Sequence, residues 1–514
     1  MNHRPTLHGA GARGLQTNPQ SPSYEGMFGR MFRTIPAAFH SEADLGELAK
    51  AMVAKAEKDQ TPETETDNEE NQGIDSGYTY LGQFIDHDLT FDPSSSLQKQ
   101  NDPNGIVDFR TPRFDLDNVY GRGPDDQPYL YKSDGRKMLM GRKLTGGDNN
   151  ARDLPRLSLT NTTNVDGRKR ALIGDPRNDE NVIVSQLQGI FLRFHNRVAD
   201  VMGRQATFSA IQQQVRWHYQ WVVLHDFLPK IVGQQVINSI LPHLANDIDD
   251  SIVDKKPQLK FYHFKENLFM PVEFSVAAYR FGHSMIRPIY RLNTTLKERN
   301  MIFDFKYPEA SLEGFREFPK NWAINWDLFF QPEGKILHNK NRTQKSYKID
   351  TSLVDPLGNL PESAAGHRTK SLAFRNLLRG ASMGLPSGQN VARFMGIMPI
   401  TDEDLKIGKA TADDANTNKS IVDISPKFKD NAPLWYYILS EAQHECFNGN
   451  DATPFRLGAV GGRIVAEVFI GLLLGDSHSY LSLHPRWKPN ALFWNDQGKF
   501  GMRQLIDQAL QAEE

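Results

Sequence analysis

The sequence predicts a mainly α-helical protein in which one large domain surrounds a buried site. Apolar residues recur at steps of three or four through residues 182–202 and 208–232, which is the period of amphipathic helices. Residues 433–446 begin at a proline and residues 462–474 are followed by a glycine, as helices often are. Alternating patterns typical of strands are sparse, so we expect only a few short strands.

Long irregular connections separate the predicted helices. Much of residues 92–180 and 290–365 has no clear periodicity, which is unusual in a compact domain unless the connections wrap a site. Residues 1–25, rich in Gly, Pro, His and Asn, predict an N-terminal arm. The polar and acidic residues 57–72 predict a mobile loop. No linker divides residues 26–514, which we therefore expect to form one domain.

Composition limits the classes of function. The chain has 514 residues, enough to enclose a bulky cofactor, and its net charge of −2 does not favour nucleic acid or an anionic membrane as a partner. Cys446 is the single cysteine, which excludes an internal disulfide. The most apolar run, residues 464–474, is too short for a transmembrane segment. No secretory signal is recognised, so we expect a cytoplasmic or unconventionally secreted protein. No pattern indicates its oligomeric state.

Three ionisable residues in a row interrupt an apolar stretch at Asp86, His87 and Asp88. Such groups are costly to bury, and a chain rarely places three of them together for packing alone. A second isolated histidine, His283, lies on a predicted helix that follows Pro271, and residues 174–180 read GDPRNDE. Each piece alone is typical of a satisfied core histidine or a solvated turn. Together they favour a haem-centred redox site.

Peroxide activation by haem iron has defined requirements. One side of the iron needs a neutral imidazole whose other ring nitrogen is held by a hydrogen bond. The opposite side needs a base that moves the peroxide proton and a fixed cation that stabilises developing charge. His283 could be the ligand, His87 the base and Arg177 the cation.

Four motifs resemble those of animal-type haem peroxidases, the peroxidase–cyclooxygenase superfamily, and the chain looks like a bacterial-type member with site motifs similar to those of lactoperoxidase and myeloperoxidase. Residues 81–91 (LGQFIDHDLTF) resemble the distal motif, and residues 174–180 resemble the segment with the distal arginine. Residues 280–283 (RFGH) resemble the proximal helix. Residues 375–380 (RNLLRG), followed by residues 384–386 (GLP), resemble the segment whose asparagine orients the proximal histidine.

The resemblance implies a haem peroxidase that reduces hydrogen peroxide and oxidises small organic donors and possible halide or thiocyanate donors. His87 would be the distal acid/base, Arg177 its partner, and Gln83 a polar residue above the iron. His283 would ligate the iron, and Asn376 would accept a hydrogen bond from its second nitrogen. The remaining residues assigned by the resemblance are the propionate-binding Arg280 and Arg379, for which a surface position is the alternative.

The haem itself would be b-type and could be bound covalently. Asp86 and Glu180 stand where mammalian members of the family form ester bonds to haem methyl groups. Asn181 stands where myeloperoxidase has a methionine bonded to a haem vinyl group, so that third link is excluded. The alternative is that both carboxylates are simply hydrogen-bonded.

A calcium site is implied by the same resemblance. Asp88, with Thr111, Arg113, Asp115 and Asp117, matches the family's calcium segment, and alternate residues of an extended loop present oxygen donors on one side, as a hard cation prefers. The family usually has Phe at position 113, which gives only its carbonyl, and Ser at position 117. The aspartate at 117 adds negative charge, which favours the ion. A plain turn stabilised by aspartate side chains is the alternative.

Two other functions stay open. A fatty-acid dioxygenase of the same superfamily would place a tyrosine three residues before the proximal histidine, where this chain has Arg280; Tyr279 is one residue earlier and points elsewhere on a helix. A haem- or calcium-binding scaffold without turnover would have lost the distal base or cation, and both are present. A helical protein without haem is the third alternative. Three further histidines on predicted helices receive no role: His195, His218 and His225.

Overall fold

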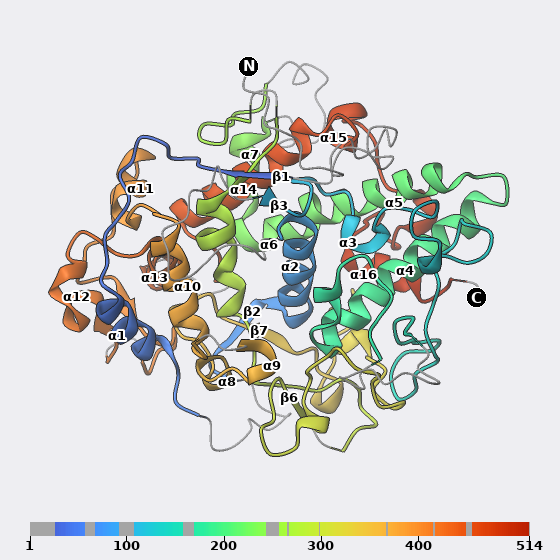
Figure 1. Ribbon diagram of the computed structural model, residues 1–514, viewed down its shortest axis with the longest axis horizontal. Coiled ribbons are helices and arrows are strands. Elements are labelled where there is room, and N and C mark those ends of the chain that lie inside the picture. The colour runs from blue at the N-terminus through green and yellow to red at the C-terminus, as the bar shows by residue number, and fades with distance from the viewer. Residues whose placement is uncertain are drawn as a thin grey trace.

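A computed structural model describes residues 26–56, 67–91, 107–157, 169–242, 256–264, 267–297, 299–365, 369–414, 417–448 and 455–512. Helix accounts for 44% of the structure and strand for 9%, which confirms the mainly α prediction. Helix α2 (Ser76–Leu89) lies near the middle of the molecule and the other long helices surround it (Figure 1). The predicted N-terminal arm, residues 1–25, lies outside the described residues.

The helices differ widely in length. The other long ones are α1 (Glu42–Met52), α4 (Val182–Met202), α5 (Phe208–Val222), α10 (Leu372–Ser382), α13 (Leu434–Asn448) and α14 (Ala459–Gly475). The short ones are α3 (Asp117–Tyr120), α6 (Leu228–Val232), α7 (Gln234–Ile240), α8 (Asp355–Gly358), α9 (Glu362–Ala365), α11 (Gly388–Phe394), α12 (Ile421–Ile424), α15 (Tyr480–Leu483) and α16 (Met502–Ala509).

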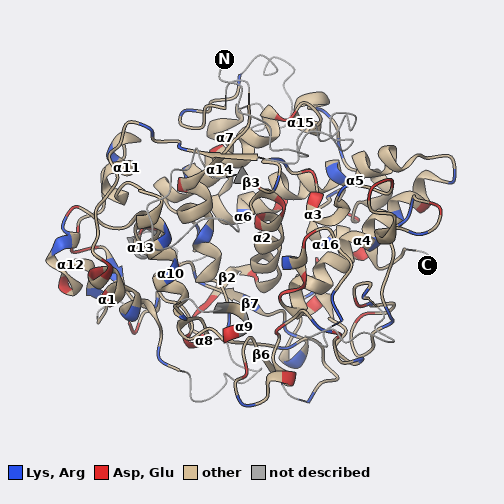
Figure 2. Cartoon of the chain, viewed as in Figure 1, with Lys and Arg blue, Asp and Glu red and all other residues tan. Residues whose placement is uncertain are grey.

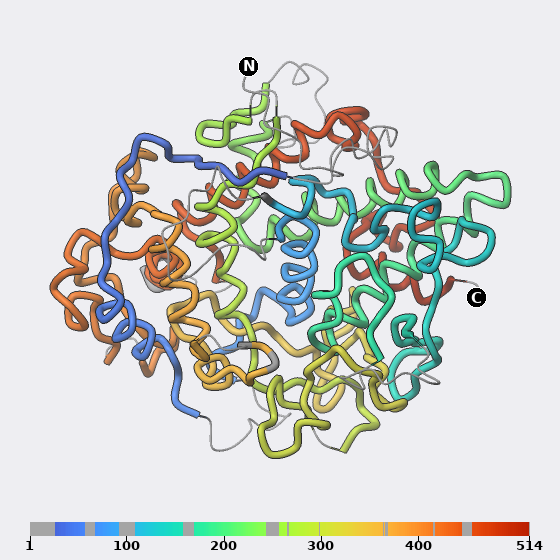
Figure 3. Tube along the Cα trace, in the orientation of Figure 1, coloured from blue at the N-terminus to red at the C-terminus, as the bar shows by residue number. Residues whose placement is uncertain are grey.

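The strands form small separate sheets, as expected from the sparse alternation. They are β1 (Gly26–Gly29), β2 (Glu70–Asp75), β3 (Val107–Asp108), β4 (Met270–Pro271), β5 (Ile289–Tyr290), β6 (Asn300–Met301), β7 (Lys345–Tyr347), β8 (Lys406–Ile407) and β9 (Lys419–Ser420). The first sheet has the order β3-β1-β4, and the other described strands pair as β2-β7, β5-β6 and β8-β9. The segment from β1 to α1 runs along the region of α10–α12 (Figure 3), where the Ala38 amide donates to the Leu385 carbonyl over 2.9 Å.

The periodic segments form the predicted helices. α4 begins after Asn181, whose Oδ1 accepts from the amides of Ile183 and Val184 at 3.1 and 2.8 Å. Residues 208–232 form one continuous helical run through α5, a π-helical turn at Val223–Phe227, and α6. α14 begins before the predicted residue 462, because the Glu441 carboxylate of α13 accepts from amides of its first turn.

The predicted acidic loop at 57–72 is only partly a loop. Residues 57–66 lie outside the described residues, but Glu70, Asn71 and Gln72 belong to strand β2. Glu70 is buried and forms ion pairs with Arg287 at 2.9 Å and Arg342 at 2.6 Å, so its charge is balanced inside the fold. Because β2 runs directly into α2, this buried pairing helps to hold the start of α2.

The segment that carries His283 is helical but not the regular helix that the sequence predicted. It consists of a π-helical turn, Glu273–Ala277, followed by a 3₁₀ helix, η8 (Ala278–His283). Ala277 has φ −125° and ψ −73°, which breaks the helix between them. Arg280 Nε donates to the Ser275 carbonyl over 3.0 Å, where a regular α-helix would use the Tyr279 amide.

A large cluster of buried apolar side chains joins the central elements. Phe84 of α2 stacks on Phe191 of α4 with ring centres 4.3 Å apart, and Tyr279 contacts Phe469 of α14 at 5.3 Å. α2 lies against α4 and against η8. Within the described part of the chain, no helix is both long and apolar enough to cross a bilayer.

Candidate active site

Three predicted site residues share one face of α2. Gln83, Asp86 and His87 are three and four residues apart, which aligns them along a helix. Phe84 and Ile85 between them are buried in the core, whereas Gln83 and Asp86 keep partial exposure deep in the molecule. The polar face of α2 therefore borders an interior space instead of packed side chains.

His87 is buried and its ring orientation is held on one side. Its Nδ1 donates to Asn178 Oδ1 over 2.7 Å, and its Nε2 lies 3.8 Å from Glu180 Oε1. Burial and, secondarily, the nearby Arg177 charge lower the pKa of His87 to about 3. The imidazole is therefore neutral near pH 7, and its Nε2 lone pair is the free basic atom.

Arg177 lies on the 3₁₀ turn Pro176–Asp179 beside His87. Asp175 caps that turn, accepting from the Arg177 amide at 2.8 Å, and pairs with the Arg177 guanidinium at 2.8 Å. The same guanidinium donates to the His87 carbonyl over 3.1 Å and lies over the Phe91 ring at 4.4 Å. The predicted cation is thus tied to the backbone of the predicted base.

Arg110 was not predicted from the sequence and completes this arrangement. It lies 2.5 Å from Asp175 and 3.6 Å from Asp117, and it donates to the His87 carbonyl over 3.3 Å. Burial alone would raise the pKa of Asp175, but the Arg177 and Arg110 charges outweigh it and hold that pKa below its usual range. Arg110 links the distal segment to the acidic cluster at Asp117.

Glu180 and Gln83 face each other across the distal side. Gln83 Nε2 donates to Glu180 Oε1, and Asn181 Nδ2 donates to Gln83 Oε1 over 3.1 Å. Burial raises the pKa of Glu180 to about 7, and burial also raises the pKa of Asp86. Glu180 therefore has access to the protonated form near neutral pH. Thr90 Oγ1 donates to Asp86 Oδ1 over 3.2 Å.

His283 ends η8 with its Nδ1 engaged and its Nε2 available. Asn376 of α10 lies 2.8 Å from Nδ1, and burial, followed by the Arg280 charge, lowers the pKa of His283 to about 3. A Cβ on neighbouring Gly282 would meet no atom within 4 Å, so open space adjoins η8 one residue before His283. His283 itself is partly exposed inside the fold, and a neutral imidazole in such a place fits the requirement for an iron ligand.

The hydrogen bond between His283 and Asn376 runs in the opposite direction to the expected one. The amide nitrogen of Asn376 faces His283 Nδ1, so Asn376 donates where the sequence predicted that it accepts. The cause is Arg280. Its guanidinium can only donate, and it donates a hydrogen bond to Asn376 Oδ1 over 2.9 Å. Arg379 follows Asn376 by one turn of α10, on the same side of that helix.

The distal and proximal segments border the same region. The Tyr279 hydroxyl of η8 donates to the Gly82 carbonyl of α2 over 3.2 Å. The charges of Arg177, from the distal turn, and Arg280, from η8, both act on Asp86. Tyr279 is buried and directed at the backbone of α2. Five partly exposed side chains thus meet inside the fold from these segments: Gln83, Asp86, Glu180, Arg280 and His283.

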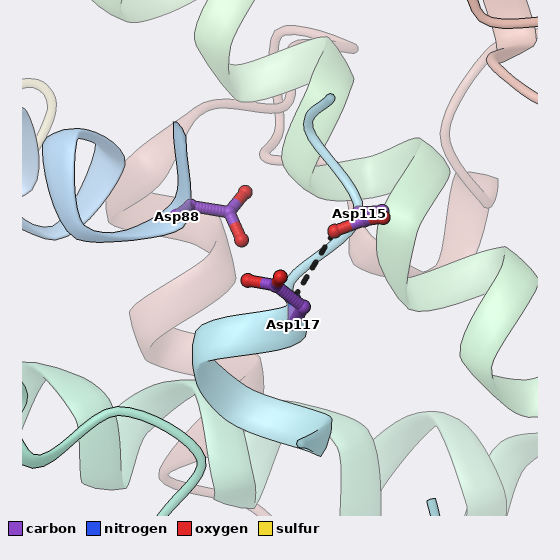
Figure 4. Close-up of side chains that lie close together, drawn as sticks. All are labelled: Asp88, Asp115 and Asp117. Atoms are coloured by element: carbon purple, nitrogen blue, oxygen red, sulfur yellow. Dashed lines mark hydrogen bonds between the residues drawn. The ribbon is translucent and has the colours of Figure 1, made fainter. Parts of the chain in front are cut away.

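A buried acidic cluster lies beside the distal histidine. Asp88, Asp115 and Asp117 each place a carboxylate oxygen within 4.8 Å of the others (Figure 4). Acidic residues on α2 and α3 are near the middle of the molecule (Figure 2). The carboxylate oxygens of Asp88 and Asp117 accept no hydrogen bond from the described residues. Burial, followed by the charges of neighbouring aspartates, raises the pKa of Asp88 well above its usual range. Unsatisfied buried carboxylates of like charge fit a hard cation.

The other two predicted calcium residues behave differently. Thr111 Oγ1 donates to Asp115 Oδ2 over 2.7 Å, which places its oxygen at the edge of the cluster. The Arg113 guanidinium faces Asp476, with Nε 3.9 Å from its carboxylate. A guanidinium cannot ligate a cation, so Arg113 could offer only its carbonyl, and its calcium role stays a prediction.

Comparison with known proteins decides the family. Residues 97–420, more than half of the chain, match the family model described as animal haem peroxidase. The chain belongs to the animal haem peroxidase family. This match includes Arg177, His283 and Asn376 but begins after His87, whose role rests on its motif and on the geometry above.

Two relatives of this animal haem peroxidase share about a quarter of the aligned residues. It is 24% identical to mouse thyroid peroxidase over 69% of this chain and 37% of that protein. It is 23% identical to peroxinectin A of Dictyostelium discoideum over 55% of this chain and 48% of that protein. The chain thus spans less than half the length of either relative.

Solved structures support the fold. Peroxidase A from Dictyostelium discoideum superposes with a TM-score of 0.58 at 17% identity, covering 94% of this chain and 95% of that one. Rice fatty acid alpha-dioxygenase with palmitic acid superposes with a TM-score of 0.53 at 15% identity, covering 92% and 80%. At these identities the likeness concerns the fold alone.

Sequence reasoning missed four residues of the site. Arg110 directly precedes the predicted calcium segment, and Asp175 precedes a proline as helix-capping residues often do, so each had a local signal. Asn178 lies inside the recognised GDPRNDE motif. Gln188 lies among apolar residues of α4, where no pattern distinguishes it.

Proposed function

We propose that this protein is a haem peroxidase that reduces hydrogen peroxide and oxidises small donors. The observation that carries the proposal is the pair of neutral imidazoles on adjoining elements, His87 on α2 and His283 on η8. Each has Nδ1 hydrogen-bonded to an asparagine and Nε2 without a hydrogen bond from the described residues. Family membership supports haem as the cofactor.

The chain would hold haem between these two elements. His283 Nε2 would bind the iron from the proximal side, and Arg280 and Arg379 would pair with the propionates, since guanidinium groups suit carboxylates. When bound, haem supplies an iron centre that receives peroxide and accepts its oxidising equivalents. Asp86 and Glu180 would lie at the haem periphery on the distal side.

The distal residues would transfer one proton and stabilise one developing negative charge. His87 Nε2 would take the proton from the peroxide oxygen nearest the iron and return it to the departing oxygen, which leaves as water. Arg177, fixed by Asp175, would stabilise negative charge as the O–O bond breaks. Gln83 would hydrogen-bond water or a small anion beside His87. The low pKa of His87 keeps this base unprotonated over a wide pH range.

Two finer features belong to the same proposal. Asp86 and Glu180 would form ester bonds to haem methyl groups: each methyl carbon would lose two electrons and a C–H bond to hydrogen peroxide, which is reduced to water, as the carboxylate oxygen bonds to that carbon. These bonds would favour halide or thiocyanate oxidation. Asp88, Asp115 and Asp117 would bind Ca²⁺ with Thr111 and the Arg113 carbonyl. That ion would fix the backbone next to His87.

The test starts from the full chain reconstituted with haem. The expected result is a Soret band and peroxide-dependent oxidation of a phenolic dye. His87→Ala should slow the reaction with peroxide by about 10²–10⁴-fold while haem content stays unchanged. The matched control is His225→Ala, which removes a histidine hydrogen-bonded to Tyr480 and should keep the full rate.

The alternatives predict different results. A Soret band without peroxide turnover would support a non-catalytic scaffold, and oxygen uptake with linoleate in the absence of peroxide would support a dioxygenase. Haem that extracts completely into acidified organic solvent after peroxide treatment would contradict the ester bonds without contradicting the peroxidase reaction.

A further inference from the structure

A chain of buried amide groups extends from His87 into the core. Asn178 Nδ2 donates to Gln188 Oε1 over 2.8 Å, and Gln188 Nε2 donates to the Asn118 carbonyl over 3.5 Å. Asn118, Asn178 and Gln188 are fully buried, and His87 is 5% exposed. The four groups therefore exchange hydrogen bonds with one another in a region shielded from water.

The direction of this chain follows from its inner end. A backbone carbonyl can only accept, so Gln188 must present its NH₂ group to Asn118 and its oxygen to Asn178. Asn178 must then present its NH₂ group to Gln188 and its oxygen to His87. That oxygen can only accept, so His87 must carry its proton on Nδ1. A reversed amide would set two acceptors or two donors against each other in the core.

We infer that Asn178 and Gln188 are positioning residues that set the tautomer of His87, through hydrogen bonds whose direction is fixed at the Asn118 carbonyl. This inference rests on the proposed peroxidase function, in which Nε2 must be the proton acceptor. A neutral imidazole has one donor and one acceptor nitrogen, so a proton held on Nδ1 leaves Nε2 with its lone pair. Neither residue needs to contact peroxide to have this effect.

An amide suits this role better than a carboxylate. A carboxylate at position 178 would stabilise the imidazolium and favour proton retention by His87, whereas an amide oxygen selects the tautomer with little effect on the charge. Gln188 in turn prevents rotation of the Asn178 amide, which alone could face His87 with either end. Each residue in the chain therefore contributes a distinct constraint.

The first test uses the haem-free chain labelled with ¹⁵N-histidine, and assigns the His87 signals by comparison with His87→Gln. The expected spectrum shows the Nδ1–H tautomer in the unchanged protein and a mixture with Nε2–H in Asn178→Ala. His195, whose Nε2 lies 2.7 Å from the Arg136 carbonyl, serves as an internal reference that should not change. A His87 tautomer unaffected by Asn178→Ala would overturn the inference.

A matched pair at position 188 separates hydrogen-bond direction from packing. Gln188→Glu keeps an acceptor for Asn178 Nδ2 and should retain the Nδ1–H tautomer. Gln188→Leu introduces a side chain of similar size that has no acceptor and no charge. It should yield a mixture of the Nδ1–H and Nε2–H tautomers of His87. If Leu retains the tautomer and Glu loses it, Gln188 acts by packing alone and the inference fails. This comparison remains decisive if Asn178→Ala does not fold.

Loaded with haem, Asn178→Ala and Gln188→Leu should react with peroxide about 10- to 100-fold more slowly, the range for partners that orient a functional histidine. Gln188→Glu should restore most of the rate. An unchanged rate in variants with an altered tautomer would also contradict the inference. Absence of peroxide turnover in the unchanged protein would instead contradict the proposed function, because the tautomer measurement needs no haem.

Discussion

Arg110 and Asp175 form a buried ion pair, with Nη2 and Oδ2 2.5 Å apart and the Asp175 side chain fully enclosed. Asp175 also pairs with Arg177, so one carboxylate lies between two guanidinium groups. Both arginines donate to the His87 carbonyl. The backbone position of the proposed base therefore depends on a carboxylate that is enclosed in the fold.

Replacement of Asp175 by asparagine should be strongly destabilising. The Arg110 and Arg177 side chains, 11% and 22% exposed, would lose the carboxylate charge that they share, and removing one partner of a buried ion pair costs up to about 3–5 kcal/mol. Denaturant unfolding of the haem-free chain measures this loss. Glu47→Gln, which removes an exposed ion pair with Lys50, is the control and should cost less than about 1 kcal/mol. A similar small cost for both variants would contradict the proposed role of Asp175.

Calcium should stabilise the protein through the three aspartates. At a concentration about 100 times the dissociation constant, a bound ion adds about 2.7 kcal/mol to the free energy of unfolding. Thermal unfolding with Ca²⁺ and with a chelator should therefore show a higher Tm with the ion, and Asp115→Asn should remove that difference. Asp350→Asn alters a buried aspartate that accepts from the Ser352 and Ala410 amides and should keep the full increment. An increment that survives in Asp115→Asn would place the ion elsewhere.

The stability of the haem-free chain should depend on pH through Glu180. Its pKa is about 7 in the fold against an ordinary 4.5, so the folded state binds its proton more tightly. The resulting stabilisation is complete below pH 4.5 and is lost as pH rises through about 7. Glutamine at position 180 does not titrate. The free energy of unfolding of the unchanged protein should therefore fall relative to that of Glu180→Gln as the pH rises over this range. Because the side chain is 38% exposed, solvent screening keeps the effect modest.

The control for that measurement is Glu317→Gln. The Glu317 carboxylate accepts a hydrogen bond from Lys169, which lowers its pKa, so it is ionised in both folded and unfolded states above pH 5. Its difference curve should be flat between pH 5 and pH 8. A flat curve for Glu180→Gln as well would show that Glu180 has an ordinary pKa.

The fold class and the main site segments could be predicted because their signals are local. The apolar period of residues 182–202 determines α4, and the motifs around His87, Arg177 and His283 are contiguous in the sequence. The break at Ala277 could not be predicted. The Ser275 carbonyl there accepts a hydrogen bond from the Arg280 side chain, which competes with the backbone amide of a regular helix. Local propensity carries no information on that competition.

Contacts between different segments of the chain also could not be predicted from the sequence. Gln188 acquires its role only when α4 packs against the turn Pro176–Asp179 and α2, which brings its amide to Asn178 and, through Asn178, to His87. The burial of Glu70 depends on Arg287 and Arg342, more than two hundred residues away. The sequence around Glu70 is acidic and polar, so by itself it predicts a loop.

The Asn376 amide should change partners when haem binds. In the structure Arg280 donates to Asn376 Oδ1, so His283 accepts at Nδ1 and must carry its own proton on Nε2. An iron ligand needs that Nε2 lone pair and therefore a proton on Nδ1. Pairing of Arg280 with a haem propionate would release the oxygen, and a turn of the amide would let it accept from Nδ1–H.

Arg280→Met should therefore produce the ligand-competent tautomer before any haem is added, since the amide oxygen no longer has a competing donor. The ¹⁵N shifts of His283 in the haem-free chain measure this, with the Nε2–H form expected in the unchanged protein and the Nδ1–H form enriched in the variant. Arg375→Met is the matched control, because the Arg375 charge also acts on His283 but its guanidinium donates to the Ala364 carbonyl. Equal effects of both variants would mean that charge alone, and not the hydrogen bond to Asn376, determines which nitrogen of His283 is free to bind iron.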